Sequence, residues 1–194
     1  HQTVQGQEET TATLTIGTIE SLSTYVLPRL LEVFHEEHPD CKVRIVLASE
    51  SELLLQLREG KIDLAFILDT PMREEGLTTA IGFAVDMKVL LPEEHPLHTY
   101  HGIQATDLHG HPLILTEEGC TYRAYLLQTM QEATVAADIR WEMAGVDAIR
   151  QAVSKRWGIG FLPSYVVEGM GLTQGQSTEG IHILPWTQPH MNLY

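Results

Sequence analysis

The apolar run Asp63–Leu68 (DLAFIL) limits the possible folds more than any other part of this sequence, because it does not alternate with polar residues. A short strand of this kind is typical of a parallel sheet that helices cover on both faces. Strand-like segments precede it at Leu14–Ile19 and Val43–Ala48, and helix-like segments lie between at Leu22–His38 and Ser49–Gly60. The order strand, helix, strand, helix, strand predicts a parallel sheet with right-handed crossovers.

A second set of strands and helices follows a long extended region. Leu77–Leu91 alternates over more residues than one ordinary strand contains, which predicts a strand that passes from one domain into another. The chain ends at Tyr194, within another segment that reads as extended. Two α/β units joined by such crossovers place a ligand cleft between them, at the carboxyl ends of the strands. The second set comprises predicted strands over 113–116, 139–144, 158–162 and 181–184 and predicted helices over 121–133, 146–157 and 163–169.

Charge and composition exclude several classes of protein. The 12 Lys and Arg residues against 26 Asp and Glu give a net charge of −14, so we expect this chain alone to bind DNA or RNA poorly. No apolar run approaches the roughly 20 residues that span a bilayer, and residues 1–13 lack the basic and apolar regions of a secretory signal. Cys41 and Cys120 are too few for a disulfide framework, which favours a reducing cytosol.

The sequence also lacks the short motifs of common catalytic sites. No G-x-S-x-G elbow, G-x-G-x-x-G fingerprint or P-loop is present, so we expect neither an enzyme nor a cofactor. Histidines gather in one stretch that reads as a loop, and a solvated loop is favoured over a metal site, which needs three or four converging ligands. These histidines are His95, His98, His101, His109 and His111.

Four stretches carry a resemblance to a known family by their order and spacing. Residues 14–67 combine a first strand, a helix with LPRLL, an HPD turn and the segment EGKIDLAFI. LLPEEHPL follows at 90–97, DLHGHPLIL at 107–115 and AIRQAVSKRWGIGFLP at 148–163. Together they resemble the effector-binding (regulatory) domain of LysR-type transcriptional regulators, and GCTYR at 119–123 resembles a pattern in one branch of that family.

The resemblance implies an α/β fold of two Rossmann-like lobes joined by two crossover strands, similar to type II periplasmic binding proteins. It divides the chain into a linker remnant (1–13), lobe I (14–84 plus 186–194) and lobe II (85–185). A winged helix-turn-helix and a linker helix are expected before residue 1. The family normally continues past the equivalent of Tyr194 with a helix packed on lobe I.

The function implied is that of the ligand-sensing domain of a bacterial LysR-type regulator, located in the cytoplasm. A small effector, either an organic acid or amino-acid-like, would bind between the lobes, and DNA would be bound only through the N-terminal domain. We expect a homodimer, or a tetramer of the full-length protein, with no membrane contact. The alternative is a stand-alone solute-binding protein of a transporter, which shares the fold.

Candidate effector contacts in lobe I follow the first two predicted strands. Thr18 and Ser21 lie where the family places an effector contact, although a serine there also caps a helix. Ser49 and Ser51 follow the second strand, where the capping box Ser49–Glu52 is a complete structural explanation as well.

Candidate contacts in lobe II lie at the corresponding strand ends. Thr116, Cys120 and Thr121 enter the predicted cleft, and Arg123 is either a bidentate carboxylate clamp or a surface arginine of an amphipathic helix. A thiol at a helix start also allows redox sensing, for which Cys41 in the other lobe is a distant partner. The remaining candidates are Asp147, for which the helix dipole is a sufficient reason, and Phe161 and Pro163 at a strand end.

Two further patterns bear on partners. Glutamates crowd the same strand ends and would repel a multiply charged anion, which leaves neutral, cationic and zwitterionic effectors open alongside a simple carboxylate. The apolar residues of Leu22–His38 spread over roughly two-thirds of the helix, more than the stripe of about 100° that covering a sheet requires. The excess predicts a dimer contact, and the alternative is cover by a C-terminal helix. The glutamates are Glu20, Glu50, Glu117 and Glu118.

Overall fold

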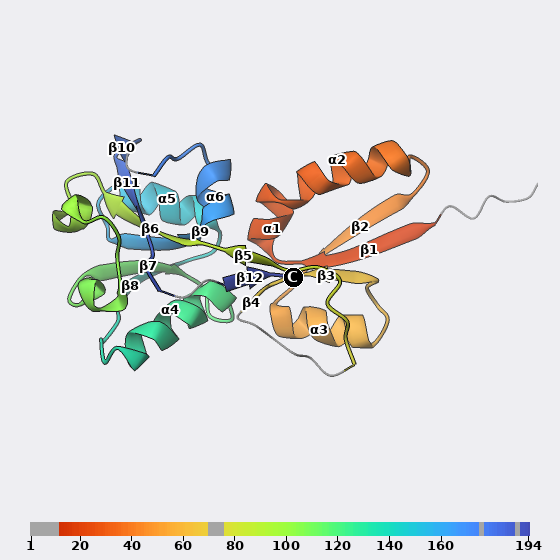
Figure 1. Ribbon diagram of the computed structural model, residues 1–194, viewed down its shortest axis with the longest axis horizontal. Helices are drawn as coiled ribbons and strands as arrows, with labels where there is room; N and C mark the ends of the chain where they lie inside the picture. The colour runs from red at the N-terminus through yellow and green to blue at the C-terminus, as the bar shows by residue number, and fades with distance from the viewer. Residues whose placement is uncertain (1–11, 70–75, 175–176, 189–190) are drawn as a thin grey trace, which may run out of the picture.

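The computed structural model describes residues 12–69, 76–174, 177–188 and 191–194, and these residues form two lobes (Figure 1). Lobe I consists of β1 (Thr13–Thr18), α1 (Glu20–Tyr25), α2 (Leu27–Glu37), β2 (Lys42–Leu47), α3 (Glu50–Arg58) and β3 (Leu64–Phe66). Its sheet has the order β2-β1-β3, and both neighbours run parallel to β1. The parallel sheet predicted for this part of the chain is therefore confirmed.

Lobe II contains a six-stranded mixed sheet in the order β10-β11-β6-β9-β7-β8. Its strands are β6 (Met87–Pro92), β7 (Pro112–Thr116), β8 (Asp138–Met143), β9 (Ile159–Pro163), β10 (Ser177–Thr178) and β11 (Ile181–Pro185). Its helices are α4 (Thr121–Glu132), α5 (Val146–Ser154) and α6 (Ser164–Gly169), with short 3₁₀ helices at Pro96–Thr99 and Ala105–Leu108. β7 runs parallel to β8 and β9, whereas β6 runs antiparallel to β9 and β11.

A third sheet lies between the lobes and contains both places where the chain crosses (Figure 1). Its strands are β4 (Leu68–Asp69), β12 (Met191–Leu193) and β5 (Phe83–Val85), in the order β4-β12-β5 with both pairings antiparallel. β5 leads into β6 of lobe II, and β12 returns from β11. The predicted fold class, two α/β lobes joined by two crossovers, is thereby confirmed.

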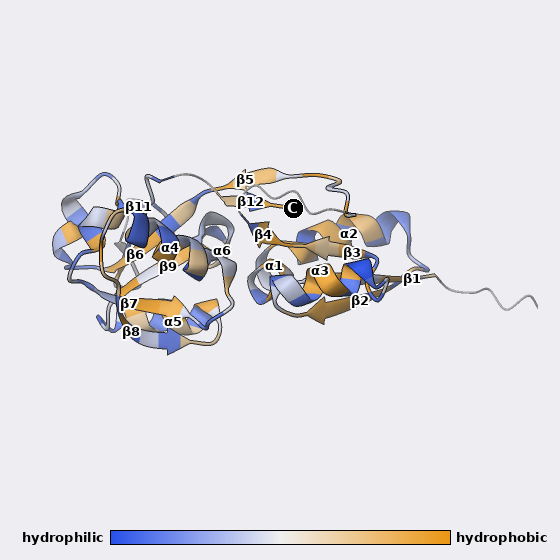
Figure 2. Ribbon diagram, turned by 90° about the horizontal axis from the view of Figure 1, so that it is seen from below, coloured by the Kyte–Doolittle hydropathy of each residue, from blue (hydrophilic) through white to orange (hydrophobic). Residues whose placement is uncertain are grey.

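The buried core is much larger in lobe II than in lobe I. One continuous cluster of buried apolar side chains runs through lobe II and the joining sheet, whereas a separate cluster in lobe I holds Leu53, Ile62 and Ile67. Apolar side chains of lobe I stay exposed on α2 and β2, whose ribbons carry much apolar colour (Figure 2). Val33 and Leu47 are 59% and 56% exposed. Lobe I therefore keeps apolar surface that its described elements do not cover.

Two elements predicted as continuous are divided. The helix predicted over Leu22–His38 is two helices, α1 and α2, which meet at Val26. Pro28 lies in the first turn of α2, where its missing N–H is harmless, whereas inside one long helix it would remove a hydrogen bond. The strand predicted over Asp63–Leu68 is interrupted at Ile67, where the backbone turns from pairing with β1 to pairing with the C-terminal residues.

The long extended region is also divided. Within Leu77–Leu91, β5 and β6 are separated at Asp86, and residues 77–82 form no strand. Most of the predicted linker, residues 1–11, lies outside the described residues, and β1 begins at Thr13. No helix in the described part of the chain is both long and apolar enough to cross a bilayer.

Candidate functional site

Two hydrogen bonds link lobe I to lobe II near the carboxyl ends of the strands. The Ser21 hydroxyl, on α1 directly after β1, lies 2.9 Å from the Tyr165 hydroxyl on α6. The Thr121 hydroxyl, at the first residue of α4, donates to Glu50 Oε2 over 2.6 Å. Ser21 and Thr121 thus both lie where the lobes meet, and each already has a partner in the opposite lobe.

Glu50 carries a partly buried carboxyl group next to that of Asp69. Burial raises the pKa of Glu50 to about 7, the Thr121 hydroxyl opposes this rise, and the Asp69 carboxyl adds to it. Burial also raises the pKa of Glu20, with a smaller contribution from the charge of Glu117. Two pairs of acidic groups, Glu50 with Asp69 and Glu20 with Glu117, thus lie close together, and at neutral pH Glu50 is protonated in a large fraction of molecules.

The other lobe I candidates take part in the fold itself. Thr18 is fully buried, and its hydroxyl donates to the Phe66 carbonyl over 3.1 Å, which fastens β1 to β3. The backbone N–H and the hydroxyl of Ser49 both donate to Glu52 Oε2, over 3.0 and 2.6 Å, so the predicted capping box is present. These bonds lower the pKa of Glu52. Ser51 is exposed, with Oγ 3.4 Å from that of Ser49.

Thr116 ends β7 with a buried hydroxyl. Among the described residues, its Oγ1 makes no hydrogen bond of normal geometry, although it lies close enough to the Cys120 thiol to lower the pKa of that thiol. A buried hydroxyl without a partner costs about 1–3 kcal/mol. Cys120 lies close by. Burial raises the pKa of its thiol, and this effect outweighs the hydrogen bonds from Thr116 and other nearby donors, which lower the pKa. The thiol is therefore mostly neutral at neutral pH and a weak nucleophile.

Arg123 is buried and bound on both sides by the protein. Its NH1 donates to the Thr116 carbonyl over 2.7 Å and to Glu142 Oε2 over 2.6 Å. These bonds hold α4 against β7 and β8. These bonds give Arg123 a structural role, and its burial contradicts the alternative of a surface arginine.

Phe161 and Pro163 lie in β9 and face the interior of lobe II. The Phe161 ring stacks on Tyr125 at 6.3 Å and meets the edge of Trp186 at 5.2 Å. Pro163 is buried opposite Met87 of β6. Both side chains contribute to the core, so we leave them out of the site proposed below.

Asp147 lies in the first turn of α5 and faces lobe I. It accepts hydrogen bonds from Gln151 and from Arg150, which lower its pKa. Its charge also helps to raise the pKa of Tyr25 on α1, together with the larger effect of burial. Asp147 is therefore close to the meeting of the lobes, and its partners on its own helix explain its conformation.

Sequence reasoning missed three groups that lie where the lobes meet. Tyr165 follows the predicted start of a helix, but no local pattern shows that its hydroxyl faces the other lobe. The sequence indicates Glu50 only as one of several charges, and it gives no sign that Asp69 lies beside it. Each owes its position to packing between segments far apart in the chain.

The described residues contain no group of three or more His, Cys, Asp or Glu side chains placed to hold a metal ion. The rings of His95 and His111 are 4.7 Å apart, and His98 lies beside His182 at 6.3 Å. Burial, with the nearby charges of His111 and His98, lowers the pKa of His95 to about 4. His95 is thus a neutral, packed side chain at physiological pH.

Comparison with known proteins gives a consistent assignment. Residues 7–175 match the family described as the LysR substrate binding domain. An uncharacterized HTH-type transcriptional regulator of Bacillus subtilis is 32% identical over 161 residues, which cover 82% of this chain and 55% of that protein. A hydrogen peroxide-inducible genes activator of Dickeya chrysanthemi is 27% identical over 185 residues, which cover 95% and 59%.

A solved structure shows the same fold. The regulatory domain of Synechocystis CcmR, solved in complex with 2-PG, superposes with a TM-score of 0.75 at 20% identity, covering 94% of this chain and 86% of that one. The chain spans little more than half the length of the two curated relatives. Those relatives are regulators rather than enzymes, and the comparisons do not support a stand-alone solute-binding protein of a transporter. The chain belongs to the LysR substrate binding domain family.

Proposed function

We propose that this chain is the effector-sensing part of a LysR-type transcription regulator, with a site for a small molecule where the lobes meet. The observation that carries the proposal is the buried hydroxyl of Thr116, which makes no hydrogen bond of normal geometry among the described residues and lies beside the Cys120 thiol, a weak acceptor. It ends the strand that leads to Cys120 and Thr121, and Thr121 is bonded to the other lobe. A ligand group that accepts or donates a hydrogen bond there would relieve the cost of the unpaired hydroxyl.

The hydrogen bonds Ser21–Tyr165 and Glu50–Thr121 suggest how an effector would change the angle between the lobes. Each favours the arrangement in which the lobes are in contact. An effector shifts such an equilibrium only through its different affinity for the two arrangements. An effector that hydrogen-bonds to the Ser21 or Thr121 hydroxyl would break a bond between the lobes and replace it with a bond between protein and effector. The changed lobe angle would then be relayed to a DNA-binding domain elsewhere in the protein.

The charges favour an amino-acid-like effector over a multiply charged anion. Glu50, Asp69 and Glu20 lie near the meeting of the lobes and attract an ammonium group. Two arginines nearby already have carboxylate partners. Arg123 forms an ion pair with Glu142, and Arg150 forms ion pairs with Asp147 and Glu179. A single carboxylate or other polar group can still bond to hydroxyls such as that of Thr116.

Thermal unfolding in the presence of separate amino acids and organic acids tests this function, because a ligand of the native state raises the melting temperature. For any compound that stabilises the chain, Thr116→Val should weaken binding at least about tenfold, the loss of roughly one hydrogen bond. Without ligand the variant should be at least as stable as the parent, since the cost of an unpaired buried hydroxyl is removed. Thr99→Val, an exposed change in lobe II, is the matched control, and equal ligand affinity of both variants would refute the site.

A peroxide-sensing role through Cys120 is not part of the proposal, although one relative is a hydrogen peroxide-inducible activator. Burial raises the pKa of this thiol, whereas redox-sensing cysteines are accessible and thiolate-rich. The other cysteine, Cys41, precedes β2 in lobe I, and both are free thiols.

We also propose a homodimer in the cytoplasm that uses the uncovered apolar surface of lobe I. Leu30 and Val33 on α2 and Leu47 on β2 are each about half exposed or more. A two-fold dimer is the commonest way for a protein to cover such a surface. We place the lobe boundaries near residues 84–85 and just after Trp186, because Trp186 packs against Phe161.

Val33→Glu places a charge in the middle of this surface and should convert the dimer to a monomer in light scattering at tens of micromolar protein, a range in which moderate dimers form. Folding should be unaffected because Val33 is 59% exposed. Glu32→Gln on the same helix is the control. A monomeric parent chain at these concentrations would contradict the proposal.

A further inference from the structure

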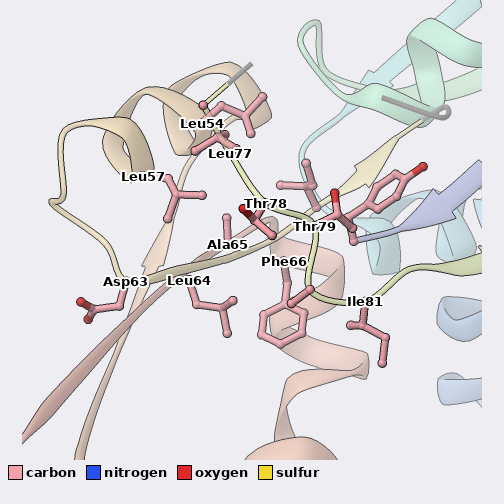
Figure 3. A pocket seen from close by; sticks show the side chains of 14 residues that line it. Leu54, Leu57, Asp63, Leu64, Ala65, Phe66, Leu77, Thr78, Thr79 and Ile81 are labelled. Atoms are coloured by element: carbon pink, nitrogen blue, oxygen red, sulfur yellow. The ribbon is translucent and has the colours of Figure 1, made fainter. Parts of the chain in front are cut away.

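A cavity in each lobe lies apart from the site proposed above, and the two differ in charge. The larger, of about 600 Å³, lies in lobe I between α3 and residues 76–81 (Figure 3). Its lining is mainly apolar, and Asp63 at one end already accepts a hydrogen bond from the Thr15 N–H over 2.7 Å. The smaller, of about 360 Å³, lies in lobe II and has Lys88 in its lining. We call this smaller cavity the Lys88 pocket.

The Lys88 pocket lies between α6 and the sheet of lobe II. Lys88 of β6 and Ile183 of β11 line it from the sheet. Ser164, Val167 and Glu168 line it from α6, and their spacing of three and four residues places them on one face of that helix. The chain after α6, over residues 171–174, completes the described lining.

Lys88 is a charged residue in an apolar setting. The other residues of β6 are apolar, and β6 is an inner strand with β9 on one side and β11 on the other. Lys88 lies opposite Leu162 of β9 and Pro185 of β11, and its side chain is only 13% exposed. An ammonium group that is largely removed from water needs acceptors or charges of opposite sign to compensate for the lost hydration.

The described residues meet this need only in part. Lys88 Nζ donates to Gln174 Oε1, an uncharged acceptor, over 3.0 Å. Asp86 Oδ2 lies 4.0 Å from Nζ, too far for a hydrogen bond, and the Asp86 side chain is 58% exposed. An ammonium group carries three N–H donors, so two remain for a partner in the cavity that Lys88 lines. The Lys88 pocket therefore offers a cation whose hydrogen bonds the described residues do not complete.

The rest of the lining limits the class of ligand. Val167, Leu172 and Ile183 offer apolar surface to a short hydrocarbon group, and the Ser164 hydroxyl adds a polar group. Glu168 also lines the pocket and would repel a second negative charge on the ligand. A volume of about 360 Å³ is at the lower end of the range for small-molecule sites. These features favour a small ligand with one negative charge and an aliphatic part.

We propose that the Lys88 pocket binds a small aliphatic monocarboxylate, whose carboxylate oxygens accept hydrogen bonds from Lys88 Nζ. The pocket is separate from the site that contains Thr116, so this proposal does not depend on the proposed function. It lies beside the crossing of the chain between the lobes, because the Ser164 N–H donates to the Asp86 carbonyl, between β5 and β6, over 2.8 Å. Tyr165 of the same helix bonds to Ser21 of lobe I.

The test titrates the chain with butyrate and with 1-butanol, its uncharged counterpart, and follows the amide chemical shifts by NMR. We expect butyrate to shift the amide signals of Val167, Leu172 and Gln174 to saturation. Lys88→Met keeps an unbranched side chain without the charge and should weaken butyrate binding at least about tenfold, the loss of a hydrogen bond to a charged group. 1-Butanol should bind the parent weaker than butyrate by a similar factor. Lys155→Met, at an exposed lysine of lobe II, is the control.

A second variant, Gln174→Glu, leaves Lys88 in place and gives its ammonium group a carboxylate of the protein. It should also weaken butyrate binding at least about tenfold, whereas Gln131→Glu, at an exposed position of α4, should not. Equal butyrate affinity of the parent and either pocket variant would overturn the proposal, as would equal affinity of the parent for butyrate and 1-butanol. An absence of saturable shifts up to about 50 mM butyrate, well above a millimolar dissociation constant, would overturn it too. Shifts confined to Thr116 and Cys120 would place butyrate in the other site and would equally overturn it.

Discussion

The carboxyl group of Glu50 belongs to lobe I and accepts its hydrogen bond from lobe II. Burial, opposed by Thr121 and reinforced by Asp69, raises its pKa to about 7. Its pKa in the unfolded chain is near the ordinary value of about 4.3. The folded state therefore holds a proton that the unfolded state releases between these values. Stability from this group is fully present below the lower pKa and is lost as pH rises to about 7.

Glu50→Gln keeps the hydrogen-bond acceptor and removes the ionisation. We expect the variant to melt higher than the parent at pH 8 by roughly 2–4 °C, the shift that about 1 kcal/mol causes in a chain of this length. A larger shift is not expected, because solvent screens the charge of a partly exposed carboxylate. At pH 5 the two should melt alike. Glu52→Gln is the control on the same helix, and an equal difference at both pH values would contradict the assignment.

At the scale of elements, the features that depend on neighbouring residues could be predicted from the sequence, whereas the contacts between the lobes could not. The start of α3 was predictable because Ser49 and Glu52 form their capping box within one turn. The break before Pro28 was also encoded locally, although the hydrophobic period alone concealed it. Ser21 and Tyr165, in contrast, are 144 residues apart in the chain. Only the packing of two lobes brings such groups together, and the hydrophobic pattern of the sequence does not indicate how the lobes pack.

The helices α4 and α6 hold the lobes in contact through these bonds. The double variant Thr121→Val, Tyr165→Phe removes both hydroxyls. It should destabilise the arrangement with the lobes in contact by about 1–3 kcal/mol, because each hydrogen bond contributes a net of about 0.5–1.5 kcal/mol. The population of open molecules should rise, and the radius of gyration in small-angle X-ray scattering should rise with it.

Thr99→Val, Tyr100→Phe makes the same chemical changes at exposed positions of lobe II and should leave the scattering curve unaltered. If the double variant of α4 and α6 scattered like this control, the two bonds would have no part in setting the lobe angle.

At the scale of the whole molecule, net charge decides what the chain does alone. A net charge of −14 opposes the phosphate backbone, and phosphate contacts supply nearly all non-specific affinity for DNA. We expect no retardation of a DNA duplex by this chain in gel electrophoresis, even at low salt. The full-length regulator is the positive control, and salt-sensitive retardation by the isolated chain would refute the expectation.

The two crossings have a mechanical consequence. β5 and β12 carry the chain between the lobes in opposite directions and form an antiparallel ladder, in which Val85 lies opposite Met191, Ala84 opposite Asn192 and Phe83 opposite Leu193. Two separate tethers would let the lobes twist and slide as well as open. A paired ribbon resists shear along its length, because sliding one strand past the other breaks the whole ladder at once. We therefore expect the lobes to move mainly by bending about this ribbon, so that a molecule that wedges them apart or draws them together drives the same rotation in one direction or the other.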